Sequence, residues 1–296
     1  MAEDLPSEVQ LIRDIKANKI PMPDDPLTFA GVDLTGEDLS NLDLPHANFS
    51  GASMEEVKAK SAGFGMSNLS HTELFDADLE NATLSMANLE AADLRKANLR
   101  NARMRESNLS HADFTNANLQ GADISLSNVE ASNFNNADMR EMHIRLVSGF
   151  ESAQWIGVDI RNVNFAGAYR LRRFVGDQNY IQEFKSTSSY MTLIYYIWWF
   201  TSDCGRSIVR WATWICFLCL FFAGLYTLLD IDYGDYPTAL SPLYFSLITL
   251  TTLGYGDAVP ASTSAQILSM IEVAIGYMML GGLLSILSNK MARRAD

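Results

Sequence analysis

The sequence has few cysteines and few basic residues, and each shortage excludes a class of protein. It contains three cysteines in 296 residues, and Cys216 and Cys219 lie within an apolar stretch, which excludes a small secreted module stapled by disulfides. Lys and Arg total 22 against 35 Asp and Glu, so we expect no binding of nucleic acid through its phosphates. The start, MAEDLPSEVQ, is acidic without an apolar core, so we expect no cleavable signal peptide.

Signatures of catalysis are also missing. There is no phosphate-binding loop and no nucleophile elbow, and the four histidines are scattered without metal-ligand spacing: His46, His71, His111 and His143. No dinucleotide fingerprint and no series of voltage-sensing arginines is found. The sequence therefore predicts no enzyme activity and no cofactor.

Charge and hydrophobicity are distributed unevenly along the chain. Residues 1–150 carry 12 Lys and Arg against 24 Asp and Glu, whereas residues 151–296 carry 10 against 11 and hold the long apolar runs. An acidic, water-facing half is thus joined to an apolar half, which predicts two domains of different kinds.

A repeat of five residues dominates the first half. From Leu34 to Ile144, 23 positions occur at steps of five, and 22 of them are Leu, Phe, Met, Ile or Val, with Ala59 as the exception. Two residues earlier Ala is common, and one residue earlier Asp or Asn. In an α-helix, steps of five advance about 500° and form no apolar stripe. In a flat strand the large residues would alternate between faces. The chain must therefore turn once per repeat, with Leu and Ala pointing inward.

Runs such as ANLEAADLRKANLRNARM (Ala87–Met104) resemble the pentapeptide-repeat family. This resemblance implies a right-handed quadrilateral β-helix with four repeats per coil, which we assign to residues 31–169. After Ile144 the frame breaks and resumes one residue out of phase at Val158, so Arg145–Gly157 is interpreted as an insertion or a cap. In residues 1–30, Ser7 and Gln10 are typical of a capping box before a short amphipathic helix that could close the first coil.

The second half contains a membrane pattern. The runs 208–229 and 265–287 are each long enough, at 1.5 Å per residue, to cross about 30 Å of hydrocarbon. The run 240–253 is too short to cross and should enter and return on one side. We therefore assign a pore-type domain to residues 207–290, followed by a tail of residues 291–296.

Basic residues flank this domain but are absent from 230–264. The positive-inside tendency places both termini and the solenoid in the cytoplasm, with the domain in the cell (inner) membrane. Residues 170–206 form an expected linker whose aromatic segment 190–200 should lie along the membrane surface. In this linker, Arg170, Arg172 and Arg173 could bind anionic lipids or pair with the acidic solenoid.

The short run ends in TTLGYGD (Thr251–Asp257). With an apolar span on each side, residues 242–257 resemble the pore helix and selectivity filter of the two-transmembrane potassium channel family. The resemblance implies potassium bound by carbonyls of Thr252, Leu253, Gly254 and Tyr255, followed by Gly256, with Asp257 at the outer mouth. The Leu253 side chain should pack behind the filter. Some members pair that Asp with a pore-helix Glu, but the aligned residue here is Ile248.

Further residues carry open alternatives. Glu272, inside the second span, is interpreted either as a hydrogen-bonded tie to the filter loop or as a proton or ion sensor. Gly276 resembles the family's inner-helix hinge, Gly281 with Gly282 is a rival, and either could only permit close packing. Three residues on one helical face are expected to line the cavity: Tyr277, Leu280 and Leu284.

The resulting prediction is a homotetrameric potassium-selective channel, since one pore loop per chain supplies a quarter of a fourfold filter. Its solenoid could regulate gating or assist assembly, and the sequence identifies no ligand for it. The alternative is a membrane-tethered scaffold whose acidic solenoid binds a protein partner. Retention of Thr252, Gly254 and Gly256 favours the channel, because a decayed pore would tolerate their loss.

Overall fold

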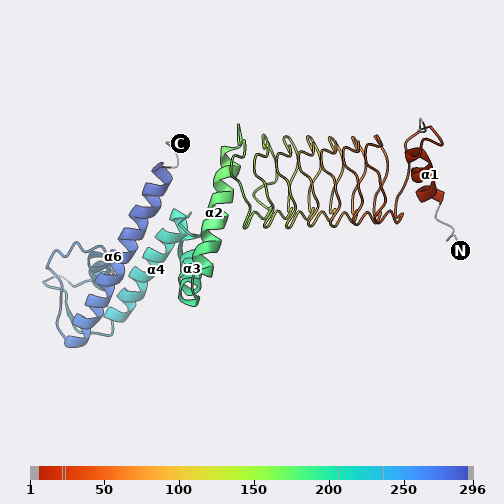
Figure 1. Cartoon of the computed structure of the whole chain (residues 1–296). Coiled ribbons are helices and arrows are strands. Elements are labelled where there is room, and N and C mark those ends of the chain that lie inside the picture. Colours follow the sequence, from red (N-terminus) through yellow and green to blue (C-terminus); the bar gives the residue numbers. More distant parts are fainter. Residues whose placement is uncertain (1–6, 22, 24, 206, 236, 293–296) are drawn as a thin grey trace. The chain divides into compact units, whose positions relative to one another are not determined.

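The computed structural model describes residues 7–21, 23, 25–205, 207–235 and 237–292, in two compact units (Figure 1). The first unit is Met1–Glu183 and the second is Phe184–Asp296. Arg206 and the tail beyond Ala292 lie outside the described residues.

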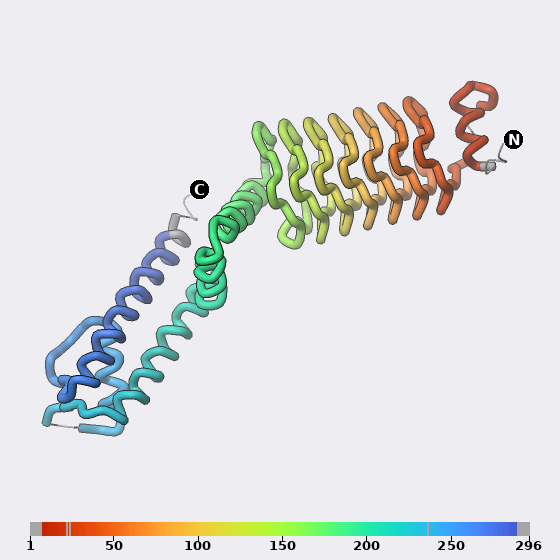
Figure 2. The backbone as a smooth tube through the Cα atoms, turned by 60° about the horizontal axis from the view of Figure 1, so that its bottom comes forward, coloured from red at the N-terminus to blue at the C-terminus, as the bar shows by residue number. Residues whose placement is uncertain are grey.

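The first unit is a four-sided solenoid (Figure 2). Parallel bridges join residues 20 apart, so each coil contains four repeats, and the ladder on one face runs Thr28, Asn48, Asn68, Asn88, Asn108, Asn128 and Ser148. Backbone amides on these faces bond to carbonyls of neighbouring coils, as in the 2.7 Å bond from Leu34 N to Ser53 O. The ladder begins with Thr28, one repeat before the predicted start, and the Phe29 side chain is fully buried.

The inward residues form one continuous apolar core. Leu, Phe, Met and Ala at the predicted positions are buried, including the exception Ala59. Aromatic rings stack between coils, with 4.8 Å between the centroids of Phe114 and Phe134 and 4.4 Å between those of Phe134 and Trp155. The alternation of large and small residues fills the narrow interior, as the repeat pattern predicts.

The shift of frame after Ile144 is a one-residue insertion. Asn128 pairs with Ser148, 20 residues on, but Asn133 pairs with Gln154, 21 residues on, and the later bridges keep that spacing. The coil continues through this segment, so Arg145–Gly157 is not a cap.

Helices close both ends of the solenoid. At the N-terminal end, α1 (Ser7–Lys16) buries Val9 and Ile12 against the core, but Gln10 donates to Asp14 rather than completing the expected capping box. At the other end, the first part of α2 (Tyr169–Ser186) buries Leu171 and Val175 against the core.

Contacts at this second end correct the expected linker. The Gln178 side chain accepts a 2.9 Å hydrogen bond from Trp155 N. The first part of the expected linker therefore belongs to the helix that caps the solenoid. Arg170 lies 3.2 Å from Glu151 and forms an ion pair with it. Of the two expected roles of this arginine, the structure thus shows the pairing with the acidic solenoid.

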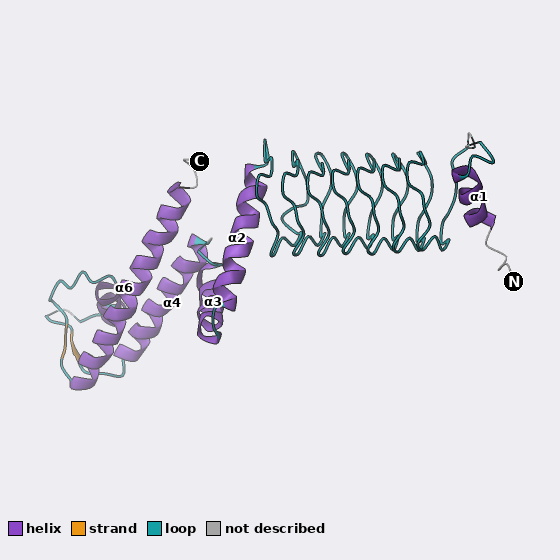
Figure 3. Cartoon of the chain, viewed as in Figure 1, coloured by secondary structure: helices purple, strands orange, loops and turns teal. Residues whose placement is uncertain are grey.

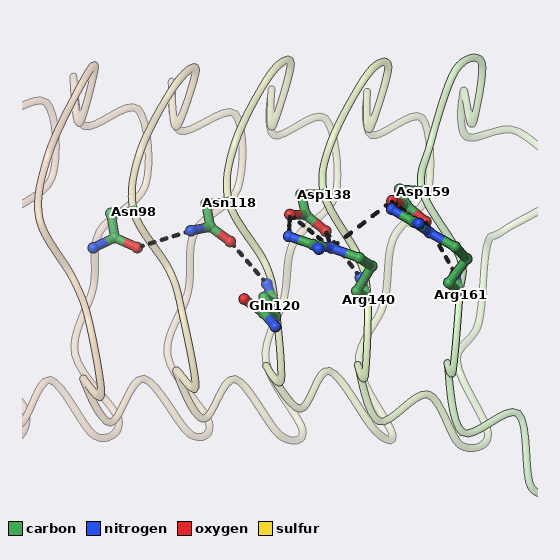
Figure 4. A network of polar contacts seen from close by, with 7 residues as sticks. All are labelled: Asn98, Asn118, Gln120, Asp138, Arg140, Asp159 and Arg161. Atoms are coloured by element: carbon green, nitrogen blue, oxygen red, sulfur yellow. Dashed lines mark hydrogen bonds and ion pairs between the residues drawn. The ribbon is translucent and has the colours of Figure 1, made fainter.

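Polar side chains form rows along the outside of the coils (Figure 4). Arg140 binds Asp138 through two nitrogens, at 2.8 and 2.6 Å, and Arg161 does the same for Asp159 at 2.9 and 2.5 Å. The Arg161 hydrogen bonds lower the pKa of Asp159 to about 2. The Arg140 hydrogen bonds lower the pKa of Asp138 in the same way.

The second unit contains helices, connecting loops and one short antiparallel strand pair (Figure 3). It contains α3 (Ser189–Ser202), α4 (Ile208–Tyr226), α5 (Ser241–Leu250) and α6 (Thr263–Ala292). Two short strands, β1 (Ile231–Asp232) and β2 (Val259–Pro260), pair antiparallel and close the connecting loops. Helices α4 and α6 are long and apolar enough to cross a membrane, which matches the two predicted spans.

Candidate functional site

A short helix positions the loop that carries the filter-like motif. Helix α5 starts at Ser241 with Pro242 in its first turn, as expected from the sequence, because proline there loses no helical hydrogen bond. Ser241 Oγ accepts a 2.7 Å bond from Thr238 N and fixes the chain entering the helix. The helix ends at Leu250, so Thr251–Asp257 leaves its C-terminal end as a loop.

Backbone carbonyls near the end of α5 hold the first four residues of the loop. The Ile248 carbonyl accepts bonds from Leu253 N at 2.9 Å and from Gly254 N at 3.4 Å. The side chains of Leu253 and Tyr255 are 60% and 69% exposed. Within a single chain, therefore, Leu253 is not covered, and its expected packing behind a filter stays a prediction.

Every second residue of the loop has a left-handed backbone. φ is +58° at Thr252, +51° at Gly254 and +80° at Gly256, but it is not positive at Leu253 or Tyr255. Glycine adopts this region without steric cost, which explains two of the three positions.

Asp257 is held by a residue that the sequence analysis did not identify. Tyr244, on α5, donates a 2.7 Å hydrogen bond to Asp257 Oδ2. Ile248, the position aligned with a family glutamate, is buried and supplies only its backbone carbonyl to the loop. The Tyr244 hydroxyl, and not a side chain at position 248, is thus the hydrogen-bond partner of Asp257.

Glu272 lies at the meeting point of α4, α5 and α6. Its side chain is fully buried. Its Oε1 lies 2.5 Å from Ser246 Oγ of α5, and its Oε2 accepts a 2.6 Å bond from the Tyr226 hydroxyl of α4. The carboxyl group therefore links the three helices behind the loop.

The three glycines of α6 have different surroundings. A Cβ on Gly276 would overlap the carbonyl oxygen of Leu250, and one on Gly282 would overlap the Trp211 ring, whereas Gly281 has nothing within 4 Å. Trp211 also donates a 2.8 Å bond from Nε1 to the Met279 carbonyl. Gly276 and Gly282 thus permit close packing, and the hinge role remains a prediction.

The expected cavity residues lie on an uncovered surface of α6. Tyr277, Leu280 and Leu284 are all exposed in this chain. The same is true of other α6 residues, including Met270 and Met278.

Three residues of the site were missed from sequence: Tyr226, Ser246 and Tyr244. The only available signal was an unpaired intramembrane acid, because Glu272 requires polar partners in an apolar surrounding. Ser207 caps α4 by accepting a hydrogen bond from Arg210 N at its side chain, and Asp203 ends α3.

Comparisons with known proteins assign a family to each half. Residues 213–293 match the family described as ion channel. Pentapeptide repeats, in eight copies, match within residues 28–58, 72–110, 87–130 and 112–145.

Among curated relatives, a two pore potassium channel b of Oryza sativa is 40% identical over 72 residues, which are 24% of this chain and 21% of that protein. The two-pore potassium channel 1 of Arabidopsis thaliana is 46% identical over 43 residues, 14% of this chain and 12% of that one. This chain therefore spans only a small part of the relatives that it matches.

Among solved structures, a pentapeptide repeat protein from the cyanobacterium Cyanothece 51142 aligns with a TM-score of 0.34 and 21% identity, over 50% of this chain and 99% of that one. Together, the family matches and the fold show that this chain combines a pentapeptide-repeat solenoid with an ion channel domain in a membrane protein.

Proposed function

We propose that the chain is one subunit of a homotetrameric, potassium-selective channel. The observation that carries the proposal is the exposed loop Thr251–Asp257, held at the end of a short helix between two apolar helices. Relatives named as potassium channels match the same region.

The loop backbone suits coordination of a dehydrated cation. Alternation of positive and negative φ turns successive carbonyls toward the same side of the chain. Rings of such carbonyls can replace the hydration shell of potassium. We assign the ion sites to carbonyls of Thr252, Leu253, Gly254 and Tyr255, with Asp257 at the outer mouth.

A single loop encloses no pore, so the proposal requires other subunits. The exposed side chains of Leu253 and Tyr255 are large apolar and aromatic groups that neighbouring subunits would cover. The plant relatives are named as two-pore potassium channels, whereas this chain has one filter motif. Four copies would then complete the ring, with Tyr277, Leu280 and Leu284 facing the cavity or a neighbour.

Purified protein in liposomes tests the proposal. We expect a tetramer by native mass measurement, uptake of potassium and rubidium well above that of sodium, and block by barium. The variant Gly254→Val should remove uptake, since a β-branched residue resists a positive φ. The matched control Gly224→Val changes a glycine of α4 with open surroundings and should retain potassium uptake. Intact tetramers without potassium uptake would overturn the proposal.

The solenoid is proposed to regulate this pore or to assist its assembly, from the cytoplasmic side of the inner membrane. Its connection to the pore unit through α2 and α3 supports a coupling. Removing the first unit, residues 1–183, should change open probability if it regulates, or tetramer yield if it assists assembly. Unchanged values for both would contradict either role.

A further inference from the structure

The buried carboxyl of Glu272 makes more oxygen contacts than the local hydrogens can satisfy. Ser246 Oγ lies 2.5 Å from Glu272 Oε1 and also 2.9 Å from the backbone carbonyl of Cys219. A serine hydroxyl carries one hydrogen, and a carbonyl only accepts. If Glu272 is ionised it also only accepts, so one of the two short contacts would join oxygens without a hydrogen between them.

The tyrosine side of the cluster supplies no spare hydrogen. Tyr226 donates to Glu272 Oε2 at 2.6 Å, and its oxygen is 3.2 Å from Ser269 Oγ. The Ser269 hydroxyl donates to the Ala265 carbonyl at 2.9 Å. A proton on Glu272 resolves the shortage: Glu272 then donates to Ser246, Ser246 donates to Cys219, and Tyr226 donates to Glu272.

No basic side chain among the described residues is placed to neutralise an ionised Glu272. The titratable groups that face the cluster are Tyr226 and Cys219 from α4 and Tyr233 from the following loop, while α5 contributes only the Ser246 hydroxyl. Within residues 207–288 the one basic side chain is Arg210, at the start of α4 and 4.0 Å from Asp203. A buried carboxylate without a cation is costly, and a neutral acid avoids that cost.

We propose that Glu272 is a protonated carboxylic acid at neutral pH that positions the pore helix, and that its deprotonation at alkaline pH reduces conduction. On ionisation the proton leaves to solvent, and the Ser246 hydroxyl turns from Cys219 to the carboxylate. That change breaks the hydrogen bond between α5 and α4. The effect on conduction rests on the proposed channel function, but the protonation does not.

Infrared spectroscopy of the full-length protein tests the protonation directly. At pH 7 the exposed acids are ionised, and Glu272 is the buried acid among the described residues. With ¹³C-labelled glutamate, we expect an isotope-shifted carbonyl band of a neutral carboxylic acid that vanishes reversibly at alkaline pH and is missing in Glu272→Gln. Absence of a labelled neutral-acid band in wild type would overturn the proposal without any variant.

Uptake measured across pH tests the consequence. Wild type should lose potassium uptake as pH rises, and Glu272→Gln should lose that alkaline decline, because an amide also donates to Ser246 and accepts from Tyr226 but does not ionise. Ser269→Ala removes the 3.2 Å contact to Tyr226 and the bond to the Ala265 carbonyl, but it leaves both contacts of the Glu272 carboxyl in place, so it should keep the wild-type profile. If the band is found but the two pH profiles coincide, the regulatory half of the proposal is wrong. If the band is found and no protein conducts, the channel function is wrong instead.

Discussion

The backbone of Gly276 on α6 packs directly against the carbonyl of Leu250, the last residue of α5, and leaves no room for a Cβ. Gly276→Ala should therefore push α6 away from α5. Overpacking of this kind costs about 1–3 kcal/mol. We expect a lower melting temperature of the assembled protein and reduced uptake.

Gly281→Ala is the matched control, because nothing lies within 4 Å of the added methyl. Alanine is a better helix former than glycine by about 1 kcal/mol, so this variant should be neutral or slightly more stable. Equal stability and uptake of both variants would contradict the packing role of Gly276.

The hydroxyl of Tyr244 is predicted to steady the outer mouth of the filter. Tyr244→Phe removes the 2.7 Å hydrogen bond to Asp257, and a hydrogen bond to a charged group contributes about 1.5–3 kcal/mol. We expect weaker barium block and less stable potassium selectivity, measured by uptake. The control is Tyr233→Phe, since the buried Tyr233 hydroxyl has no partner among the described residues. Identical behaviour of the two variants would count against the assigned role of Tyr244.

A corner of the solenoid carries a residue poorly suited to its backbone. Leu126 is exposed at φ +66°, and other repeats have Asn at the equivalent position, as at Asn101 and Asn136. A left-handed conformation costs most L-residues about 1–2 kcal/mol, and Asn tolerates it better. Leu126→Asn should therefore raise the unfolding temperature of the solenoid.

The nearby Ile124→Asn changes a fully buried inward residue and should destabilise the solenoid by several kcal/mol, on the order of 3. A loss of stability in Leu126→Asn, by calorimetry, would show that its side chain contributes more than its backbone strain costs.

The solenoid should resist acid partly through Asp159. Its folded pKa of about 2 is below the ordinary 3.8, so its stabilisation is present above about pH 4 and is lost as pH falls toward 2. Arg161→Gln removes the main cause and should move the midpoint of acid unfolding to higher pH. Arg100→Gln removes the same charge from the same face. Because Arg100 has no ion pair among the described residues, this variant should move the midpoint less. Equal shifts of the acid-unfolding midpoint in the two variants would show that net charge alone causes the effect.

Sequence patterns predict features that repeat along the chain or lie within one helix. They do not predict contacts between residues that are distant in the sequence. The period of five placed Leu and Ala inside the solenoid, and the one-residue shift of frame was visible at Val158. The start at Phe29 was missed because Leu27 and Thr28 replace the usual Ala and Asp. Tyr226 and Ser246 lie 46 and 26 residues from Glu272, so no local pattern reveals that their hydroxyls meet its carboxyl.

Potassium selectivity can be measured as the reversal potential of the reconstituted protein, with potassium on one side of a bilayer and sodium on the other. We expect a current that reverses near the potassium equilibrium potential, is blocked by barium and is absent in Gly254→Val. A reversal potential near zero from intact tetramers, or no current under any pH, would contradict a potassium-selective pore.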